Sequence, residues 1–265
     1  MEESFSLLAT LRFDPFLETL SWNNDPDGLP SPYLLLSYQF HRLATCSLAL
    51  QWPSKQDLTF TKLKSACDTI VRNVNGAGPN NPLRIRLVLS PVNLTASASP
   101  IQSLRYDPTL PSFFDPVSNI QVPFEPILRI CVDTQPTLNT VSTKTTYRRP
   151  YDDARARVGM PAVGVPPRNG VALDTPDDVI LYNTSDAIME TSICNIAFFR
   201  QGRWVTPPLS SGCIAGVFRQ WLLENDRIHE APENDISMKT IADNEWVLIF
   251  NGVNGCRLGR AWLRE

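Results

Sequence analysis

Residues 190–219 read ETSICNIAFFRQGRWVTPPLSSGCIAGVFR, and this stretch decides the fold class. CNIAFFR (194–200) predicts a strand, QGRW (201–204) a tight turn between strands, and TPPLSSG (206–212) a loop. Residues 213–224 predict a helix with an apolar face, made by Val217, Phe218, Trp221 and Leu222. The stretch therefore combines a strand, a Thr-Pro turn and the start of a helix within thirty residues.

Sequence on both sides of this stretch adds further strands and one helix. Short β-branched and apolar runs predict strands over 127–133, 178–182, 245–250 and 256–263. Apolar residues at helical spacing predict a helix over 151–158. The second half of the chain thus predicts a sheet with few helices.

The first half has a different pattern. Apolar residues spaced by three, four and seven predict helices over 32–51 and 59–75, and strict alternation predicts a strand over 83–89. Residues 91–126 are rich in Pro, Ser and Thr, which favours a long loop with at most one edge strand.

The polar run QPTLNTVST (135–143) is the expected linker between two domains. It divides the chain into a smaller N-terminal domain over 1–135 and a larger C-terminal domain over 136–265. A content of 43% hydrophobic residues supplies enough apolar surface for the core of a globular protein of this length.

Charge and composition argue against several classes of partner. The 24 Lys and Arg residues are outnumbered by 27 Asp and Glu residues, which disfavours a polybasic nucleic-acid binder. No apolar run approaches the ~20 residues of a spanning helix, and Glu2 and Glu3 stand where a secretory signal is basic. We therefore expect a cytoplasmic protein that binds neither nucleic acid nor membrane.

Metal-ligating residues are sparse. The two histidines are far apart, and the six cysteines are scattered without a CxxC pair. Zinc sites need clustered ligands, so we expect no metal and regard the cysteines as small buried hydrophobic residues.

Lysine is scarce, with five lysines against nineteen arginines, and one of them stands in an unusual segment. Lys144 lies in VSTKTTYRR, at the expected junction of the two domains, where clefts often form. Cationic neighbours such as Arg148 and Arg149 favour the neutral, nucleophilic amine. The alternative is a solvated linker lysine, because most lysines are exposed.

The segments 190–196, 205–209 and 212–219 together resemble the signature of class IV pyridoxal-phosphate aminotransferases. That signature has an acidic residue, an asparagine five positions later, a Thr-Pro turn, and a glycine-containing helix start that ends in Arg or Lys. The resemblance implies an α+β protein with a D-amino-acid aminotransferase-like fold. Its two α/β-type domains would hold the cofactor, pyridoxal 5'-phosphate, between them.

The resemblance also implies roles for single residues. Lys144 would be the catalytic lysine that attaches to the cofactor, and Glu190 would face the pyridine nitrogen. Asn195 would brace Glu190. The cofactor phosphate would be bound by Arg42, by the backbone N–H groups of Val217 and Phe218, and by the loop of Asn251 and Gly252.

Each role has a structural alternative. Glu190 could be a strand-end carboxylate in an exposed ion pair, Asn195 a turn cap, and Arg42 a charge on the polar side of a surface helix. Phe218 departs from the family, which commonly has Thr there. Only its main-chain contact with phosphate can therefore be expected, and its ring should be core.

Lys144-Thr145-Thr146 and the run 148–155, combined with the segment 190–197, look most like fungal-type 4-amino-4-deoxychorismate lyases. These enzymes release 4-aminobenzoate and pyruvate for folate synthesis, and the family usually forms homodimers. Cationic and polar side chains are the candidates for binding the substrate carboxylates; we consider Thr10, Arg12, Arg86 and Arg148.

Two other functions remain open at this point. A branched-chain or D-amino-acid transaminase would use the same cofactor contacts, so sequence physics does not separate lyase from transaminase. A catalytically inactive binding protein on the same scaffold is the third alternative; the intact Lys144 and Glu190 argue against it.

Overall fold

A computed structural model describes residues 5–53, 57–76, 78, 80–119, 121–138, 143–165 and 175–263. Residues 139–142 of the expected linker lie outside these ranges. The chain forms two compact units. Unit 1 consists of Met1–Pro108, Thr143–Tyr147 and Gly252–Asn254, and unit 2 of Thr109–Ser142, Arg148–Asn251 and Gly255–Glu265.

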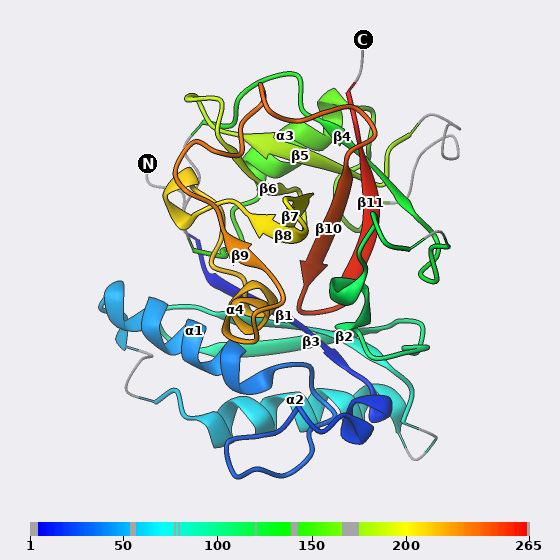
Figure 1. The fold of residues 1–265 in the computed structure, drawn as a ribbon. Coiled ribbons are helices and arrows are strands. Elements are labelled where there is room, and N and C mark those ends of the chain that lie inside the picture. Colours follow the sequence, from blue (N-terminus) through cyan, green and yellow to red (C-terminus); the bar gives the residue numbers. More distant parts are fainter. Residues whose placement is uncertain are drawn as a thin grey trace. The chain divides into compact units, whose positions relative to one another are not determined.

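Unit 1 is a three-stranded antiparallel sheet with two helices packed on it. Its strands are β1 (Leu7–Phe13), β2 (Leu83–Leu89) and β3 (Leu94–Pro100), in the order β1-β2-β3. Helices α1 (Leu36–Ala49) and α2 (Phe60–Asn75) cover one face of this sheet, as Figure 1 shows. The expected strand over 83–89 and the single edge strand in 91–126 are both confirmed.

The alternation in β2 explains which face is buried. Leu83, Ile85 and Leu87 are fully buried, whereas Arg84 and Arg86 are exposed on the opposite face. Alternate residues of β1 join the same core with apolar residues of both helices. Because strand residues alternate between faces, one face meets the helices and the other is polar.

Helix α1 begins four residues later than expected. The backbone N–H of Leu34 donates to the carbonyl of Arg12, and that of Leu35 donates to the Asn23 side chain. Leu35 also has a left-handed φ of 53°. The segment before Leu36 is therefore held by partners distant in sequence. Helix α2 starts as expected, with the Thr59 side chain accepting from Lys62 N–H.

Unit 2 is built on an eight-stranded mixed sheet in the order β6-β5-β4-β11-β10-β7-β8-β9. The strands are β4 (Leu128–Val132), β5 (Asp178–Tyr182), β6 (Ile188–Thr191), β7 (Asn195–Arg200), β8 (Arg203–Thr206), β9 (His229–Glu230), β10 (Trp246–Asn251) and β11 (Gly255–Trp262). Short 3-10 turns are η1 (Pro15–Thr19) in unit 1, and η3 (Leu110–Phe113) and η4 (Leu209–Ser211) in unit 2. The expected strands of the second half are confirmed to within two residues.

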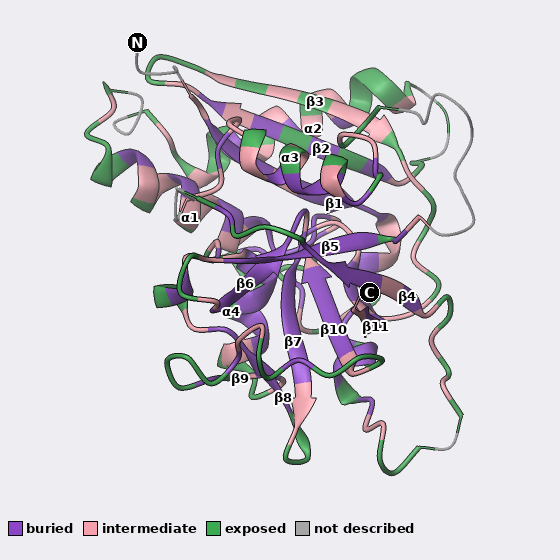
Figure 2. Cartoon of the chain, turned by 90° about the horizontal axis from the view of Figure 1, so that it is seen from above, coloured by how far each residue is buried: buried purple, intermediate pink, exposed green. Residues whose placement is uncertain are grey.

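This sheet curls back on itself. Strand β6 stands at one end of the strand order and β7 is sixth, yet a tight turn joins them, in which Thr191 N–H donates to the Cys194 carbonyl. Helix α3 (Arg149–Arg157) packs its Ala154 and Val158 side against Val179 and Leu181 of β5. In Figure 2 the central strands of this sheet are buried along most of their length.

Two boundaries differ from the sequence predictions. Residues 109–135 belong to unit 2, not to the first domain, because β4 pairs in parallel with both β11 and β5. Helix α4 covers only Val217–Glu224, because Gly216 has an extended backbone and is the N-cap residue. The prediction that the helix begins at residue 213 was therefore wrong by one turn.

Candidate active site

In unit 1, the outer edge of β1 brings Lys144 and Arg42 to one residue. The N–H of Leu8 donates to the Lys144 carbonyl at 2.9 Å. The Leu8 carbonyl accepts from Arg42 Nη2 at 3.1 Å. Arg42 and Lys144, about a hundred positions apart in the sequence, thus bond to the carbonyl and to the N–H group of the same residue.

The Arg42 guanidinium is partly satisfied and partly unpaired. Its Nη2 also donates to Gln39 Oε1 at 2.9 Å, and Gln39 Nε2 donates to the Thr10 carbonyl at 3.1 Å. Its Nε is buried and has no hydrogen-bond partner among the described residues. Burial lowers the pKa of Arg42 from its ordinary value to about 10. A buried cationic donor without an acceptor fits an anion such as a phosphate group.

Arg12 has a structural role. Its backbone N–H donates to the Gly252 carbonyl at 3.1 Å, and its Nε donates to the Val253 carbonyl at 2.7 Å. Its Nη1 donates to Asp14 Oδ2 at 2.7 Å and to the Gln102 carbonyl at 2.8 Å. The side chain is buried and donates to three of these partners, Val253, Asp14 and Gln102, so the geometry gives no support to the expected substrate contact. Arg12 instead fixes the loop of Gly252 against β1.

The other two substrate candidates of unit 1 lie side by side. Thr10 of β1 is directly opposite Arg86 of β2 in the antiparallel register, so both lie on the sheet face away from the helices. Arg86 is exposed and Thr10 is half-buried. This face therefore presents a cation and a hydroxyl at neighbouring positions.

In unit 2, Glu190 is buried and both of its carboxylate oxygens accept hydrogen bonds. The Tyr151 hydroxyl donates to Oε1 at 2.8 Å, and Asn195 Nδ2 donates to Oε2 at 3.3 Å. Asn195 Nδ2 also donates to the Ile214 carbonyl at 2.8 Å. Glu190 is therefore an interior carboxylate rather than a surface charge, and Asn195 is the brace expected from the sequence.

Arg148 and Asn251 lie around the same turn. Arg148 Nη2 donates to the Ser192 carbonyl at 3.0 Å, and its guanidinium carbon lies 5.3 Å from the centre of the Tyr151 ring. Asn251, at the end of β10, donates to Cys194 Sγ at 3.0 Å. Both side chains thus anchor the turn that follows Glu190.

The start of α4 is a second feature suited to an anion. The N–H groups of Val217 and Phe218 are in the first turn, where no intrahelical carbonyl is available and the helix dipole favours negative charge. The Phe218 ring is buried and stacks at a tilt on Trp221, 6.2 Å between ring centres, as expected for a core residue. Arg219 pairs with Glu230 and donates to the Pro207 carbonyl at 2.9 Å, which holds the Thr-Pro loop against this helix.

Gly216 links the helix start to Glu190 through Asn195. A Cβ at Gly216 would lie 2.0 Å from Asn195 Oδ1 and 3.2 Å from its Cγ. We predict that Gly216→Ala displaces the Asn195 side chain and lowers the free energy of unfolding by about 1–3 kcal/mol, the range for overpacking. Urea denaturation measures this loss. Gly78→Ala is the matched control, since its Cβ would meet only Asn75 O, at 3.4 Å; equal stability of both variants would contradict the prediction.

Sequence reasoning missed three residues: Gln39 beside Arg42 in unit 1, and Tyr151 and Gly216 around Glu190 and Asn195 in unit 2. Gln39 is three residues before Arg42 on α1, a spacing that places both on one helix side. Gly216 was counted as helix interior, although glycine is an accepted N-cap residue. Tyr151 carried no sequence signal for its bond to Glu190, because the two residues are 39 positions apart.

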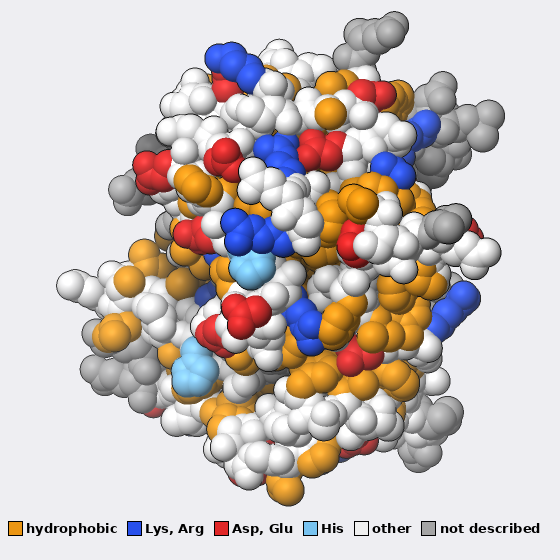
Figure 3. All heavy atoms as spheres, viewed as in Figure 1, with side chains coloured by type: hydrophobic (Ala, Val, Ile, Leu, Met, Phe, Trp, Pro, Cys, Tyr) orange, Lys and Arg blue, Asp and Glu red, His pale blue; other side chains and the backbone are white. Residues whose placement is uncertain are grey.

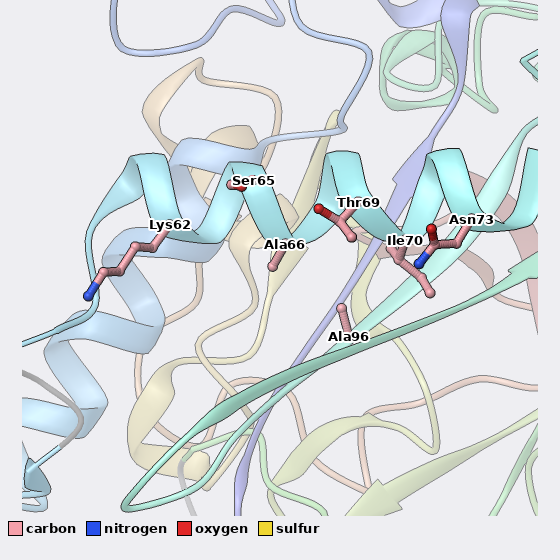
Figure 4. A pocket seen from close by; sticks show the side chains of 7 residues that line it. All are labelled: Lys62, Ser65, Ala66, Thr69, Ile70, Asn73 and Ala96. Carbon is pink, nitrogen blue, oxygen red and sulfur yellow. The ribbon is translucent and has the colours of Figure 1, made fainter. Parts of the chain in front are cut away.

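The structure also has an open hollow in unit 1, of about 410 Å³ (Figure 4). It is lined by Lys62, Ser65, Ala66, Thr69, Ile70 and Asn73 of α2 and by Ala96 of β3. Its lining includes none of the candidate site residues that the sequence singled out.

Residues 18–262 match the family model for class IV amino-transferases. The chain belongs to the class IV aminotransferase family. Membership confirms the resemblance that the sequence indicated over residues 190–219, and it places the chain in a family of enzymes.

Two curated fungal relatives of this class IV chain are similar to parts of it. A provisionally named aminodeoxychorismate lyase from Schizosaccharomyces pombe is 39% identical over 84 residues, 32% of this chain and 36% of the relative. The aminodeoxychorismate lyase of Saccharomyces cerevisiae is 36% identical over 128 residues, 44% of this chain and 32% of the relative. The matched segments span about a third of each relative's length.

Solved structures share the fold of this class IV chain at low identity. A provisionally named amino-acid aminotransferase from Mesorhizobium loti has a TM-score of 0.63 at 21% identity, covering 97% of this chain and 100% of that one. A provisionally named 4-amino-4-deoxychorismate lyase from Legionella pneumophila has a TM-score of 0.61 at 14% identity, with coverages of 98% and 83%. The holo form of a branched-chain aminotransferase from Thermobaculum terrenum, with pyridoxal phosphate, scores 0.60 at 13% identity, with coverages of 97% and 76%. These likenesses confirm the α+β fold expected from the sequence.

No helix among the described residues is long and apolar enough to cross a membrane. No group of three or more His, Cys, Asp or Glu side chains among them could hold a metal ion. The six cysteines all lie among the described residues and form no disulfide there. Five of them are buried, as expected. On the face drawn in Figure 3, basic and acidic side chains are interspersed rather than gathered by sign.

Proposed function

We propose that this chain is a pyridoxal-phosphate-dependent lyase that converts 4-amino-4-deoxychorismate to 4-aminobenzoate and pyruvate. The observation that carries the proposal is the meeting of Lys144 and Arg42 at Leu8, with a buried Arg42 Nε that lacks an acceptor. A family with this cofactor needs a lysine and a phosphate-binding cation close together. The two fungal relatives support the choice of reaction.

The residues present fit the cofactor. Arg42 and the N–H groups of Val217 and Phe218 are donors suited to its phosphate, and the loop of Asn251 and Gly252 would complete that site. Glu190, an interior carboxylate with two donors of its own, suits a protonated ring nitrogen. Pyridoxal phosphate, when bound, supplies an electron sink for the substrate carbon that carries the amine.

The chain's own residues would then move one proton and hold another in place. Lys144 Nζ would remove the proton from the aminated ring carbon of the substrate, and Glu190 would keep a proton on the ring nitrogen of the cofactor. The C–O bond to the enolpyruvyl group breaks and its oxygen leaves with the electron pair as an enolate. The methylene carbon of this enolate takes up one proton, which balances the one that Lys144 removed, and gives pyruvate. Loss of this group makes the remaining ring aromatic, so the step is downhill. Arg86 with Thr10, and Arg148, are proposed to bind the substrate carboxylates.

A transaminase is the second candidate, because the solved structures with this fold include aminotransferases. The experiment is to incubate the purified protein and pyridoxal phosphate with 4-amino-4-deoxychorismate and no 2-oxo acid. A lyase releases pyruvate and 4-aminobenzoate in equal amounts. Amino transfer that requires a 2-oxo acid, without pyruvate release, would overturn the lyase proposal and support the transaminase.

The cofactor proposal makes Arg42 testable. We predict that Arg42→Ala weakens binding of pyridoxal phosphate by roughly 10- to 150-fold, the equivalent of the 1.5–3 kcal/mol of a hydrogen bond to a charged group. Absorbance titration of the cofactor measures the change. Arg72→Ala on α2 is the control, since its side chain is exposed and bonds within its own helix. Unchanged cofactor affinity in Arg42→Ala would place Arg42 outside the phosphate site.

The assembly and setting of the enzyme are also part of the proposal. We propose a cytoplasmic homodimer that acts in folate synthesis, needs no metal, and binds neither nucleic acid nor membrane. Sedimentation equilibrium gives the oligomeric state, and a fluorescent fusion gives the compartment. A monomer with full lyase activity would overturn the proposed dimer.

A further inference from the structure

Glu190 has a second hydrogen-bond donor besides the expected asparagine. The Tyr151 hydroxyl lies 2.8 Å from Oε1, whereas Asn195 Nδ2 lies 3.3 Å from Oε2 and shares its donors with the Ile214 carbonyl at 2.8 Å. Hydrogen bonds weaken with length, so the bond from Tyr151 is the stronger one. It comes from α3, the helix that begins five residues after Lys144.

The Tyr151 ring is held in place by its surroundings. It is 8% exposed and packs with Ala154, Val179 and Leu181 in one apolar cluster. The Arg148 guanidinium lies 5.3 Å from the ring centre and is itself anchored to the Ser192 carbonyl. These contacts hold the ring on several sides, so its hydroxyl stays within hydrogen-bonding distance of the Glu190 carboxylate.

The backbone around Glu190 is clamped independently. Buried Asp178 on β5 accepts from the side chains of Thr191, at 2.7 Å, and Ser192. Arg155, one turn after Tyr151 on α3, donates to Ser192 Oγ at 2.9 Å. These contacts fix the residues after Glu190, and the bonds from Tyr151 and Asn195 orient its side chain.

The charges facing Glu190 favour donation by Tyr151. Burial, and next the Glu190 carboxylate, raise the pKa of Tyr151 far above its ordinary value, so the hydroxyl keeps its proton. Burial, with Glu190, also raises the pKa of the Cys213 thiol to about 11, so this neighbour is neutral near pH 7. Arg148 and the pair of Arg155 with Asp178 are further charged groups near Tyr151, and Arg219 and Glu230 act on Cys213.

We propose that Tyr151 is a positioning residue that holds the Glu190 carboxylate ionised and aimed at the ring nitrogen of the cofactor. The proposal rests on the proposed function for its reaction, but the bond it invokes joins two residues of unit 2. Tyr151 acts through Glu190 and touches no reacting atom.

The experiment is a double-mutant cycle with Tyr151→Phe, Glu190→Gln and the double variant, measured on the full chain. In the wild-type background, Tyr151→Phe should weaken pyridoxal-phosphate binding by about tenfold, as expected for a lost bond to a charged group. In the Glu190→Gln background it should have almost no further effect. The acid limb of the turnover profile should also move to higher pH in Tyr151→Phe, because a donor to the ionised carboxylate is lost.

Tyr33→Phe is the matched control. Tyr33 is a buried tyrosine of unit 1 whose hydroxyl also donates to a carboxylate, Asp68, at 2.5 Å. Tyr33→Phe should lower the free energy of unfolding by an amount comparable to Tyr151→Phe. It should leave the affinity for pyridoxal phosphate and the acid limb of the turnover profile unchanged. Equal weakening by Tyr151→Phe in both Glu190 backgrounds, or an unchanged acid limb, would overturn the positioning role.

Two further arms separate this proposal from the proposed function. If the wild-type protein binds no pyridoxal phosphate, the proposed function fails, and the cycle is measured on urea unfolding. There the two substitutions should be non-additive by at least about threefold in the unfolding constant, and additivity would overturn the inference. Should Tyr151→Phe not fold, Tyr151→His, which keeps an aromatic donor, should retain more cofactor affinity than Tyr151→Leu; equal affinities would contradict the proposal.

Discussion

Lys144→Ala should abolish lyase turnover, with a fall on the order of 10³-fold or more, because a positioned general base contributes 10²–10⁴-fold. The variant loses both the amine that would attach to the cofactor and the base that would remove the substrate proton. Its Leu8 contact uses the Lys144 backbone carbonyl, so the fold should persist. Pyruvate release measures turnover, and borohydride reduction followed by peptide mapping locates the cofactor adduct.

Lys62→Ala controls for the loss of a lysine from unit 1. Lys62 is exposed on α2 and pairs loosely with Asp57 at 3.6 Å. The Lys62→Ala variant should keep wild-type turnover. In the wild-type protein, the reduced cofactor adduct should map to Lys144 alone. An active Lys144→Ala protein, or an adduct on another lysine, would remove Lys144 from the mechanism.

Local sequence patterns predicted most of the secondary structure. The alternation of β2 and the helical spacing of α2 gave elements at the expected residues, because each pattern matches a buried face of its own element. The start of α1 could not be predicted, since Arg12 and Asn23 take the N–H groups before it. Strand β6, Ile188–Thr191, is too short to show a period of two.

The candidate site divides in the same way. Glu190 and Asn195 were identified because they stand in one short signature, and the structure joins them. Leu8 was not identified, because it contacts Arg42 and Lys144, which are 34 and 136 positions away in the sequence. Tyr151 was not identified for the same reason, because its partner Glu190 is 39 positions away. Arg12 was predicted to bind a substrate carboxylate because it is a cation. The sequence does not show which partners a cation has in the fold. In the structure the Arg12 side chain is buried and donates to three acceptors, which favours a structural role.

Glu190→Gln is the second large effect, and its cause is the chemistry of the donors around it. The carboxylate accepts from both Tyr151 and Asn195. A glutamine has one oxygen and one NH₂ group, so one of these two donors would face another donor. It also has no charge with which to keep a proton on the cofactor's ring nitrogen. We predict a fall in turnover on the order of 10²-fold or more, comparable to the loss of one preorganised electrostatic partner.

Glu245→Gln separates that chemistry from the simple loss of a carboxylate in unit 2. Glu245 Oε1 pairs with Arg200 Nε at 2.9 Å, so this control loses a salt bridge and has no proposed role at the cofactor. Both variants should unfold at lower urea than the wild type, but Glu245→Gln should keep its turnover. Lowering the pH should reproduce the Glu190→Gln defect in the wild-type enzyme, because a protonated Glu190 is likewise neutral and presents a donor of its own. If Glu190→Gln turned over at the wild-type rate, the carboxylate would be a structural acceptor for α3 and β7, and the ring nitrogen would need another partner.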